Sequence, residues 1–405
     1  MLNQSVSVHE VKAALLEFHE KKGYKIFESF PIVSNDPTVL FTNATITPFK
    51  HWFTDYSIKP HNYALIQQCV RIGGASELET IGVNPYYFSY FEMFGSGTFG
   101  VKTEGVVSYL LELLDTVGIT KERLYFTVPT YGDFIIALNE NGIKNSKIFL
   151  LNNNDFFWQE WKFGEPGPVG HGLSVIFSRS SRKVSSIEEL AANPEDFVEL
   201  LNLIHIHSQT LPDKTLTSVP HPGFDLGMGI ERIIAVLKGC NSYQIDTINP
   251  LVRVVHEFLI KKTRRLDVTT ARISADHLRT SCVLLGKGLR PSNKRHGYVL
   301  RKLIRRFLEL IWISTDSITA TEVLVEDFVT VMGQCDQLTA VPISIVTESI
   351  CNEERALKSV LQKARDIIQK QPMTSLRKLR DTYGLPPSLI KFLQQNRKGD
   401  NDETH

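Results

Sequence analysis

Residues 224–237 read FDLGMGIERIIAVL, and no other stretch decides as much about the fold. Its two glycines, Gly227 and Gly229, permit a close approach of the backbone to a neighbouring group. The apolar run that follows predicts a helix that begins at about Gly229 and ends at Gly239. Arg232 then falls on the first turn of this helix. Asp225, just before the glycines, can hold a cationic amine.

Two earlier stretches complement this one. Residues 69–74, CVRIGG, place Arg71 at the end of a strand-like run, where its planar guanidinium can bind a phosphate. Residues 90–95, YFEMFG, carry aromatic side chains that can stack on a base. Taken singly, each is ordinary, because strand arginines are usually surface residues and strand aromatics are usually core. Together, two arginines and an aromatic platform beside Asp225 predict a site for a bent nucleoside triphosphate and an amine.

The composition is that of a globular protein, with 42% apolar and 22% charged residues among 405 and a formal net charge of +1. No window approaches about 18 consecutive apolar residues, so neither a transmembrane helix nor a membrane partner is predicted. The first ten residues, MLNQSVSVHE, lack the basic and apolar regions of a secretory signal. The five cysteines are far apart and odd in number, which fits neither a disulfide framework nor a zinc site. We therefore expect a reducing, cytoplasmic location.

Strand and helix signals alternate in the first part of the chain, and the later part is helical. The pattern predicts a first domain at 1–242, a helical domain at 243–395 and a polar tail at 396–405. An opening helix is predicted over 7–22, where Ser7 and Glu10 have the spacing of a capping box. Residues 152–172 and 215–224 are predicted to be loops, because Gly, Pro or Asn interrupts both.

Basic residues cluster in the helical domain although the whole chain is nearly neutral. Eight basic residues and no acid occur from 287 to 306, namely Lys287, Arg290, Lys294, Arg295, Arg301, Lys302, Arg305 and Arg306. A smaller cluster precedes them at Lys261, Lys262, Arg264 and Arg265. Such clustering is the electrostatic footprint of a phosphate-backbone contact. A solvated basic helix face accounts for the same charges equally well.

Three histidines are candidates for a metal site. His205 and His207 alternate as on a strand, and His171 lies in a glycine-containing segment. No suitably spaced cysteines accompany them, so we interpret them as structural histidines and assign no metal ligand to the protein.

The chain resembles the alanyl-tRNA synthetase family, collinearly from about residue 7 to 386. The resemblance rests on FPIVSNDPTVLFTNATITPFKHWF (30–53), QQCVRIGGASELETIG (67–82), FEMFGSGTFG (91–100), FWQ (157–159), FDLGMGIERIIAVL (224–237), ISADHLRT (273–280), LRPSNKRHGYVLRKLIRR (289–306) and LRDTYGLP (379–386). It implies an α+β fold, in which the antiparallel sheet of a class II aminoacyl-tRNA synthetase, flanked by helices, precedes an all-α tRNA-recognition domain.

The resemblance implies a site for ATP and Mg²⁺. Arg71 corresponds to the arginine that grips the α-phosphate, and Arg232 to the one that lies against adenine and the γ-phosphate. These two are the implied catalytic residues. Phe91, or its neighbour Tyr90, corresponds to the aromatic that stacks on adenine. The implied ATP-binding set is Arg71, Glu79, Tyr90, Phe91, Gly229 and Arg232.

The resemblance also implies sites for alanine and for the acceptor stem of tRNA. Asp225 corresponds to the aspartate that binds the α-ammonium of alanine, and Trp158 to the tryptophan that walls the pocket. Asn202, Ile204 and Gly227 complete the implied amino-acid site, and Asn43 lies near it. Asn293 and Asp381 correspond to the pair that reads a G·U wobble pair, with Arg301 and Arg305 as further tRNA-binding residues.

Four departures from the family pattern bear on function. Ala75 stands where the family has a lysine near the phosphates, in a loop that is one residue shorter. Residues 167–174 read GPVGHGLS, so two cysteines and a glutamate of the family are replaced. Ile204 replaces a valine at the pocket floor. The chain also stops before the family's editing and carboxy-terminal domains. Since a pocket for alanine rejects glycine and serine only weakly, we expect a separate deacylase to correct errors, or a product outside translation.

Three hypotheses follow. The first is ATP-dependent activation of alanine and its transfer to the 3′ end of alanine tRNA, without editing in cis. Its support is the retention of Asn293 and Asp381, which only a tRNA reader needs. The second is a repurposed enzyme that activates a small amino acid for a non-tRNA acceptor. The third is a non-catalytic RNA-binding protein, against which the retained Arg71, Arg232 and Asp225 argue.

Overall fold

The computed structural model describes residues 6–72, 75–151, 160–180, 182–263, 267–335, 341–370, 379 and 385–395. The side chains of 75–77 are outside this description, so the structure says nothing of Ala75 beyond its backbone. The chain divides into two compact units, Met1–Ile245 and Asp246–His405. The division falls three residues after the boundary expected at 242.

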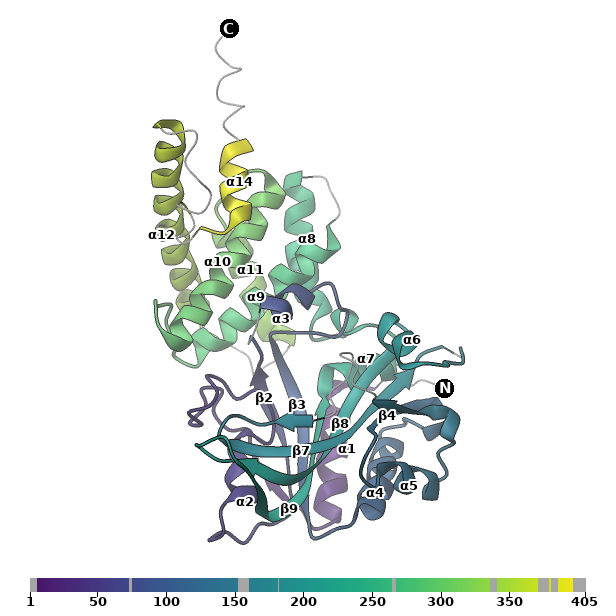
Figure 1. The fold of residues 1–405 in the computed structure, drawn as a ribbon. Coiled ribbons are helices and arrows are strands. Elements are labelled where there is room, and N and C mark those ends of the chain that lie inside the picture. Colours follow the sequence, from purple (N-terminus) through teal and green to yellow (C-terminus); the bar gives the residue numbers. More distant parts are fainter. Residues whose placement is uncertain are drawn as a thin grey trace. The chain divides into compact units, whose positions relative to one another are not determined.

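The first unit is built on a mixed sheet, to which its described residues contribute nine strands (Figure 1). The strand order is β1 (Lys25–Phe27), β2 (Tyr63–Val70), β3 (Tyr90–Phe99), β9 (Leu216–Gly229), β8 (Phe197–Thr210), β7 (Gly167–Ser178), β4 (Leu124–Pro129) and β5 (Ile148–Leu151), with β6 (Glu160–Lys162) paired to β7. The central pairs from β2 to β4 are antiparallel, as the resemblance implied. The two edge pairs, β1–β2 and β4–β5, are parallel.

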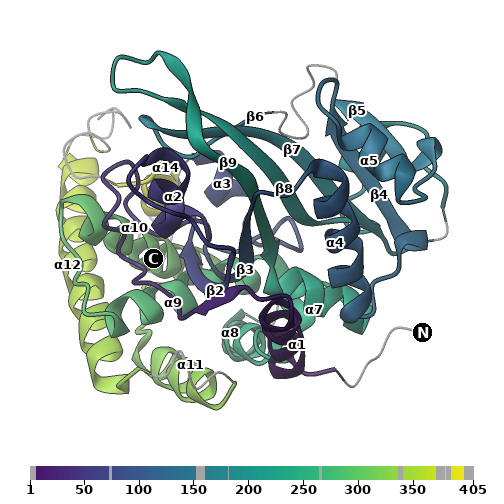
Figure 2. The same cartoon turned by 90° about the horizontal axis from the view of Figure 1, so that it is seen from below.

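Short helices surround this sheet, and α4 and α5 lie side by side in two views (Figures 1 and 2). The helices are α1 (Val8–Lys21), α2 (Lys50–Thr54), α3 (Ala75–Thr80), α4 (Thr103–Thr116), α5 (Phe134–Glu140), α6 (Ile187–Ala192) and α7 (Ile230–Lys238). The prediction for α1 is confirmed, including the reciprocal bonds of the capping box between Ser7 and Glu10. Gly239 ends α7 in the left-handed conformation, with φ of 69°, as its position predicted.

The two predicted loops were partly wrong. Strands β6 and β7 occupy much of 160–172, and β9 runs through 216–224 as one strand. The prolines of β9, Pro220 and Pro222, lie where the ladder with β8 is interrupted, between the paired residues Ser218 and Gly223. Proline is tolerated in a strand wherever its missing N–H is not needed by a neighbour.

The second unit consists of helices, and its described residues contain no strand. The helices are α8 (Asn249–Thr263), α9 (Val268–Gly286), α10 (Arg295–Thr315), α11 (Glu322–Cys335), α12 (Ile343–Lys370) and α14 (Pro387–Gln395). Phe307, Trp312 and Phe328 are fully buried in its core. Among the residues described in either unit, no helix is long and apolar enough to span a bilayer.

Candidate functional site

Strand β9 sets the geometry of the candidate site. Asp225 lies opposite Gly97 of β3 and Ile204 of β8, and Gly227 lies opposite Gly95 and Asn202. Because side chains alternate along a strand, these residues share one face of the sheet. The structure therefore brings together Asn202, Ile204, Asp225 and Gly227, four of the five residues expected to bind the amino acid. The fifth, Trp158, lies outside the described residues.

Asp225 is the charged centre of this face. Its side chain is 3% exposed, and its Oδ1 atom has no hydrogen-bond partner among the described residues. Burial raises its pKa to about 7, because a carboxylate loses hydration when it is enclosed. A buried carboxylate with an unused acceptor is suited to a cationic group that arrives with a ligand.

The neighbours of Asp225 on β8 divide into a polar and an apolar residue. The Oγ of Ser174 donates a hydrogen bond of 2.6 Å to Oδ1 of Asn202, which fixes this amide on the face. Ile204 is 4% exposed and packs in an apolar cluster with Ile46 and Phe53. The β8 surface beside Asp225 is thus apolar at Ile204 and polar at Asn202.

Arg71 follows β2 directly and is exposed. Its Nε donates a hydrogen bond of 2.9 Å to the backbone oxygen of Asn43, and its guanidinium lies 5.2 Å from the ring centroid of Phe91. Of the two aromatic candidates, Tyr90 is fully buried, at 0% exposure. Phe91 is half-buried and lies beside Arg71, so its ring is the more accessible of the two.

Arg232 lies on the first turn of α7, as predicted. Its Nη1 donates to the backbone oxygen of Glu199 at 2.9 Å and to the Glu199 carboxylate at 3.2 Å. Its Nε donates to the backbone oxygen of Tyr86 at 3.2 Å, and the ring of Tyr87 lies 5.0 Å away. These contacts hold the guanidinium next to the exposed ring of Tyr87.

The register of the sheet relates the two arginines to Asp225. Strands β2 and β9 lie on opposite sides of β3, with Val70 opposite Tyr90 and Gly229 opposite Met93. Arg71 and Arg232 therefore leave the sheet near the same end of β3. Asp225 lies four residues before Gly229, or roughly 13 Å along the strand at about 3.3 Å per residue. Of the other residues expected to bind ATP, Gly229 caps α7 and Glu79 is exposed on α3.

Sequence reasoning missed Tyr63 of β2. Tyr63 lies opposite Gly97, which in turn lies opposite Asp225. Its side chain is 0% exposed, and its hydroxyl has no hydrogen-bond partner among the described residues. No motif contains it, and only the cross-strand register reveals that it borders the site.

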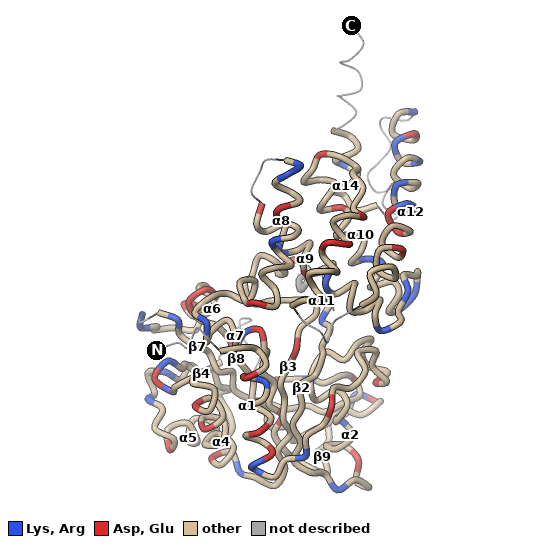
Figure 3. The backbone as a smooth tube through the Cα atoms, turned by 180° about the vertical axis from the view of Figure 1, so that it is seen from behind, with Lys and Arg blue, Asp and Glu red and all other residues tan. Residues whose placement is uncertain are grey.

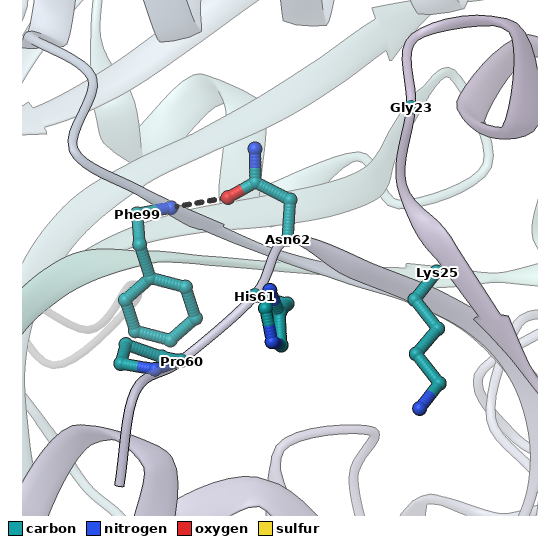
Figure 4. A pocket seen from close by; sticks show the side chains of 6 residues that line it. All are labelled: Gly23, Lys25, Pro60, His61, Asn62 and Phe99. Atoms are coloured by element: carbon teal, nitrogen blue, oxygen red, sulfur yellow. Dashed lines mark hydrogen bonds between the residues drawn. The ribbon is translucent and has the colours of Figure 1, made fainter.

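Two hollows open elsewhere in the first unit. One, of about 540 Å³, is lined by residues of the segment 30–51 and by 166–168, and contains the ion pair between Asp36 and Lys50 at 2.6 Å. The other, of about 420 Å³, is lined by Lys25, His61, Asn62 and Phe99, with Gly23 and Pro60 (Figure 4). None of the predicted site residues lines either hollow.

The three histidines lie on the opposite face from Asp225, since His205 pairs with His171 and Phe224. The ring centroids of His171 and His207 are 4.8 Å apart, and burial lowers the pKa of His171 to about 4. The described residues contain no group of three or more His, Cys, Asp or Glu that could hold a metal ion.

In the second unit, the expected tRNA-binding residues form a network around one carboxylate. Arg301 and Arg305 of α10 both donate to Glu353 of α12, at 2.9 and 3.3 Å. Arg301 also donates to Oδ1 of Asn293. The Glu353 side chain is 8% exposed, and Figure 3 marks the basic residues of α10 and α12 in blue. Asp381 lies outside the described residues.

Known proteins resemble this chain along nearly its whole length. The family model described as tRNA synthetases class II (A) matches residues 10–404. The alanine–tRNA ligase of Sulfurimonas denitrificans is 32% identical over 400 residues, covering 94% of this chain and 46% of its own length. That of Parvibaculum lavamentivorans is 30% identical over 420 residues, covering 98% and 46%. The chain thus spans about half the length of these curated relatives.

Among solved structures, the apo histidyl-tRNA synthetase of S. aureus is 13% identical with a TM-score of 0.35, covering 56% of this chain and 65% of its own. The family model alone covers nearly all of the chain. The chain therefore belongs to the family of class II (A) tRNA synthetases.

Proposed function

We propose that the chain activates alanine with ATP and transfers it to the 3′ end of alanine tRNA. One observation carries the proposal. On one face of a sheet, a buried carboxylate with an unused acceptor, Asp225, lies one strand segment away from two arginines, Arg71 and Arg232. This arrangement suits an amino acid whose ammonium binds Asp225 and whose carboxylate faces a triphosphate bound by the two arginines.

The chemistry requires no nucleophile from the protein. The α-carboxylate of alanine attacks the α-phosphorus of ATP, the bond to the β-phosphate oxygen breaks, and pyrophosphate leaves. Negative charge builds on the phosphoryl oxygens, and Arg71 and Arg232 stabilise it. A hydroxyl of the terminal ribose of tRNA then attacks the carbonyl carbon of the adenylate, and AMP leaves. The protein contributes position and charge.

Mg²⁺ would enter with the triphosphate. The Glu199 carboxylate, which is 27% exposed beside Arg232, is the oxygen ligand type that this ion prefers. When bound, the ion would neutralise part of the phosphate charge.

ATP–pyrophosphate exchange tests the first half of the proposal. Across alanine, serine, glycine and larger amino acids, we expect exchange with alanine. Arg71→Ala and Arg232→Ala should each lower kcat/KM by about 100-fold or more, the effect of removing one preorganised charge from a transition state. Lys147→Ala, on the β5 side of the sheet, is a control that should leave exchange unchanged. Absence of exchange with every amino acid would overturn the proposal.

Transfer to an acceptor-stem minihelix tests the second half. Asn293→Ala and Asp381→Ala should lower alanylation of a minihelix that contains the G·U pair, and leave pyrophosphate exchange intact. A chain that forms adenylate but alanylates no minihelix would contradict the tRNA step.

A second candidate function keeps the activation chemistry but uses a non-tRNA acceptor. The observation that favours it is the network in the second unit, where Arg301 and Arg305 both bond to Glu353 and Arg301 also bonds to Asn293. Side chains that satisfy each other are less available to RNA. Screening acceptors with and without tRNA, after exchange is established, separates the two candidates.

A further inference from the structure

Two buried polar atoms on the same face have no hydrogen-bond partner among the described residues. They are Oδ1 of Asp225 and the hydroxyl of Tyr63. Both side chains are almost completely enclosed, at 3% and 0% exposure. An unsatisfied buried polar group costs about 1–3 kcal/mol, so two of them on one face of the sheet point to a ligand that satisfies both.

The position of the Tyr63 hydroxyl is fixed by packing. The ring of Tyr63 stacks on Phe49, with centroids 3.8 Å apart and planes 15° apart, and meets Trp52 edge-on at 5.5 Å. Below it lies Gly97, where an added Cβ would come within 2.1 Å of the ring. Only glycine at position 97 allows the ring to lie across β3 toward Asp225 on the next strand. Phe49 and the backbone of Gly97 thus hold the ring from two sides.

The two groups are chemically complementary to one ligand. Burial, together with the nearby charge of Asp225, raises the pKa of Tyr63 well above its ordinary value, so its hydroxyl is neutral. A neutral hydroxyl has lone pairs that accept a hydrogen bond, and an ionised carboxylate accepts another. A primary ammonium group supplies three N–H donors and a positive charge.

We propose that the Tyr63 hydroxyl is a second acceptor for the α-ammonium of the substrate, beside Asp225, and that this pair selects α-amino acids whose ammonium has at least two N–H donors. This inference rests on the proposed function. Two acceptors need two N–H donors, which an N,N-dimethylated ammonium does not supply, because it has a single donor. They reject an α-hydroxy acid, which has a single donor and no charge to offset the carboxylate.

Tyr63→Phe is the direct test, because it removes only the hydroxyl and keeps the stacked ring. In ATP–pyrophosphate exchange, the KM for alanine should rise about tenfold, the loss expected for one hydrogen bond to a charged group. The kcat should stay within about twofold, the KM for ATP should not change, and the preference for alanine over N,N-dimethylalanine should shrink. Tyr24→Phe is the matched control, since its hydroxyl lies 2.8 Å from Oγ1 of Thr98, next to Gly97 but on the other face of β3.

A thermal measurement reports on the same site without catalysis. Without ligand, Tyr63→Phe should melt at the same temperature as the wild type or higher, because it removes an unsatisfied buried group. Alanine should raise the Tm of the wild type and of Tyr24→Phe more than that of Tyr63→Phe. An unchanged KM and an unchanged alanine-dependent shift in Tyr63→Phe would overturn the inference. Absence of exchange in the wild type would instead overturn the proposed function.

Discussion

At the scale of single residues, Asp225 makes the site sensitive to pH. Its pKa of about 7 means that near neutrality the free protein holds a mixture of carboxylic acid and carboxylate. Only the carboxylate attracts an ammonium group, so a proton must leave before the amino acid binds. Below pH 7, kcat/KM for alanine in pyrophosphate exchange should fall up to tenfold for each unit. The KM for ATP over the same range is the control, and a flat profile for alanine between pH 5.5 and 8.5 would contradict this role.

The same carboxyl group should affect stability in a predictable direction. Its pKa is raised from 3.8 when unfolded to about 7 when folded, so between these values the folded protein binds more protons. Stability is therefore lost as the pH rises through this window, by up to roughly 4 kcal/mol in total. Asp225→Asn does not titrate and should escape this loss. Urea unfolding should show that the free energy of unfolding of the variant, relative to the wild type, increases from pH 4 to pH 8. A constant difference would show that burying the ionised Asp225 does not destabilise the fold.

At the scale of elements, the position of Gly97 in β3 predicts how a substitution there changes stability. A Cβ added there would lie 2.1 Å from the Tyr63 ring, which Phe49 prevents from moving away. Gly97→Ala should destabilise the protein by about 1–3 kcal/mol, as overpacking does. Gly333→Ala in α11 is the opposite case, because its added Cβ meets nothing within 4 Å. It should stabilise by about 0.5–1 kcal/mol through helix propensity.

Urea unfolding measures both glycine variants. Adding Tyr63→Leu to Gly97→Ala should recover most of the lost free energy of unfolding, because the smaller side chain removes the clash. A Gly97→Ala variant as stable as the wild type would mean that the ring does not lie over position 97.

Elements were predictable from sequence where the pattern is local. The capping box at Ser7, the stop at Gly239 and the helices after residue 243 depend on neighbours within one or two turns. The strand through Pro220 and Pro222 was not predictable, because a proline is harmless only where the ladder happens to be interrupted. Tyr63 was hidden for a similar reason. Its place beside Asp225 depends on the register of three strands that are far apart in the chain.

At the scale of the whole molecule, a net charge of +1 conceals a concentration of charge in the second unit. Eight basic residues without an acid occur between Lys287 and Arg306, and yet two of them, Arg301 and Arg305, are paired with Glu353 across the helices. Glu353 of α12 thus neutralises part of the positive charge of α10. Net charge and sequence spacing alone could not reveal that balance.

Removing the Glu353 charge tests whether this face meets RNA. Glu353→Gln should release Arg301 and Arg305 from an ion pair and tighten binding of an acceptor-stem minihelix severalfold at low salt. The logarithm of the binding constant should also fall more steeply with the logarithm of salt, by about one further phosphate contact. Glu326→Gln on α11 is the matched control, since this exposed residue carries the same charge elsewhere in the unit. Equal effects of the two variants would mean that RNA senses only net charge, and that the α10–α12 face is not where it binds.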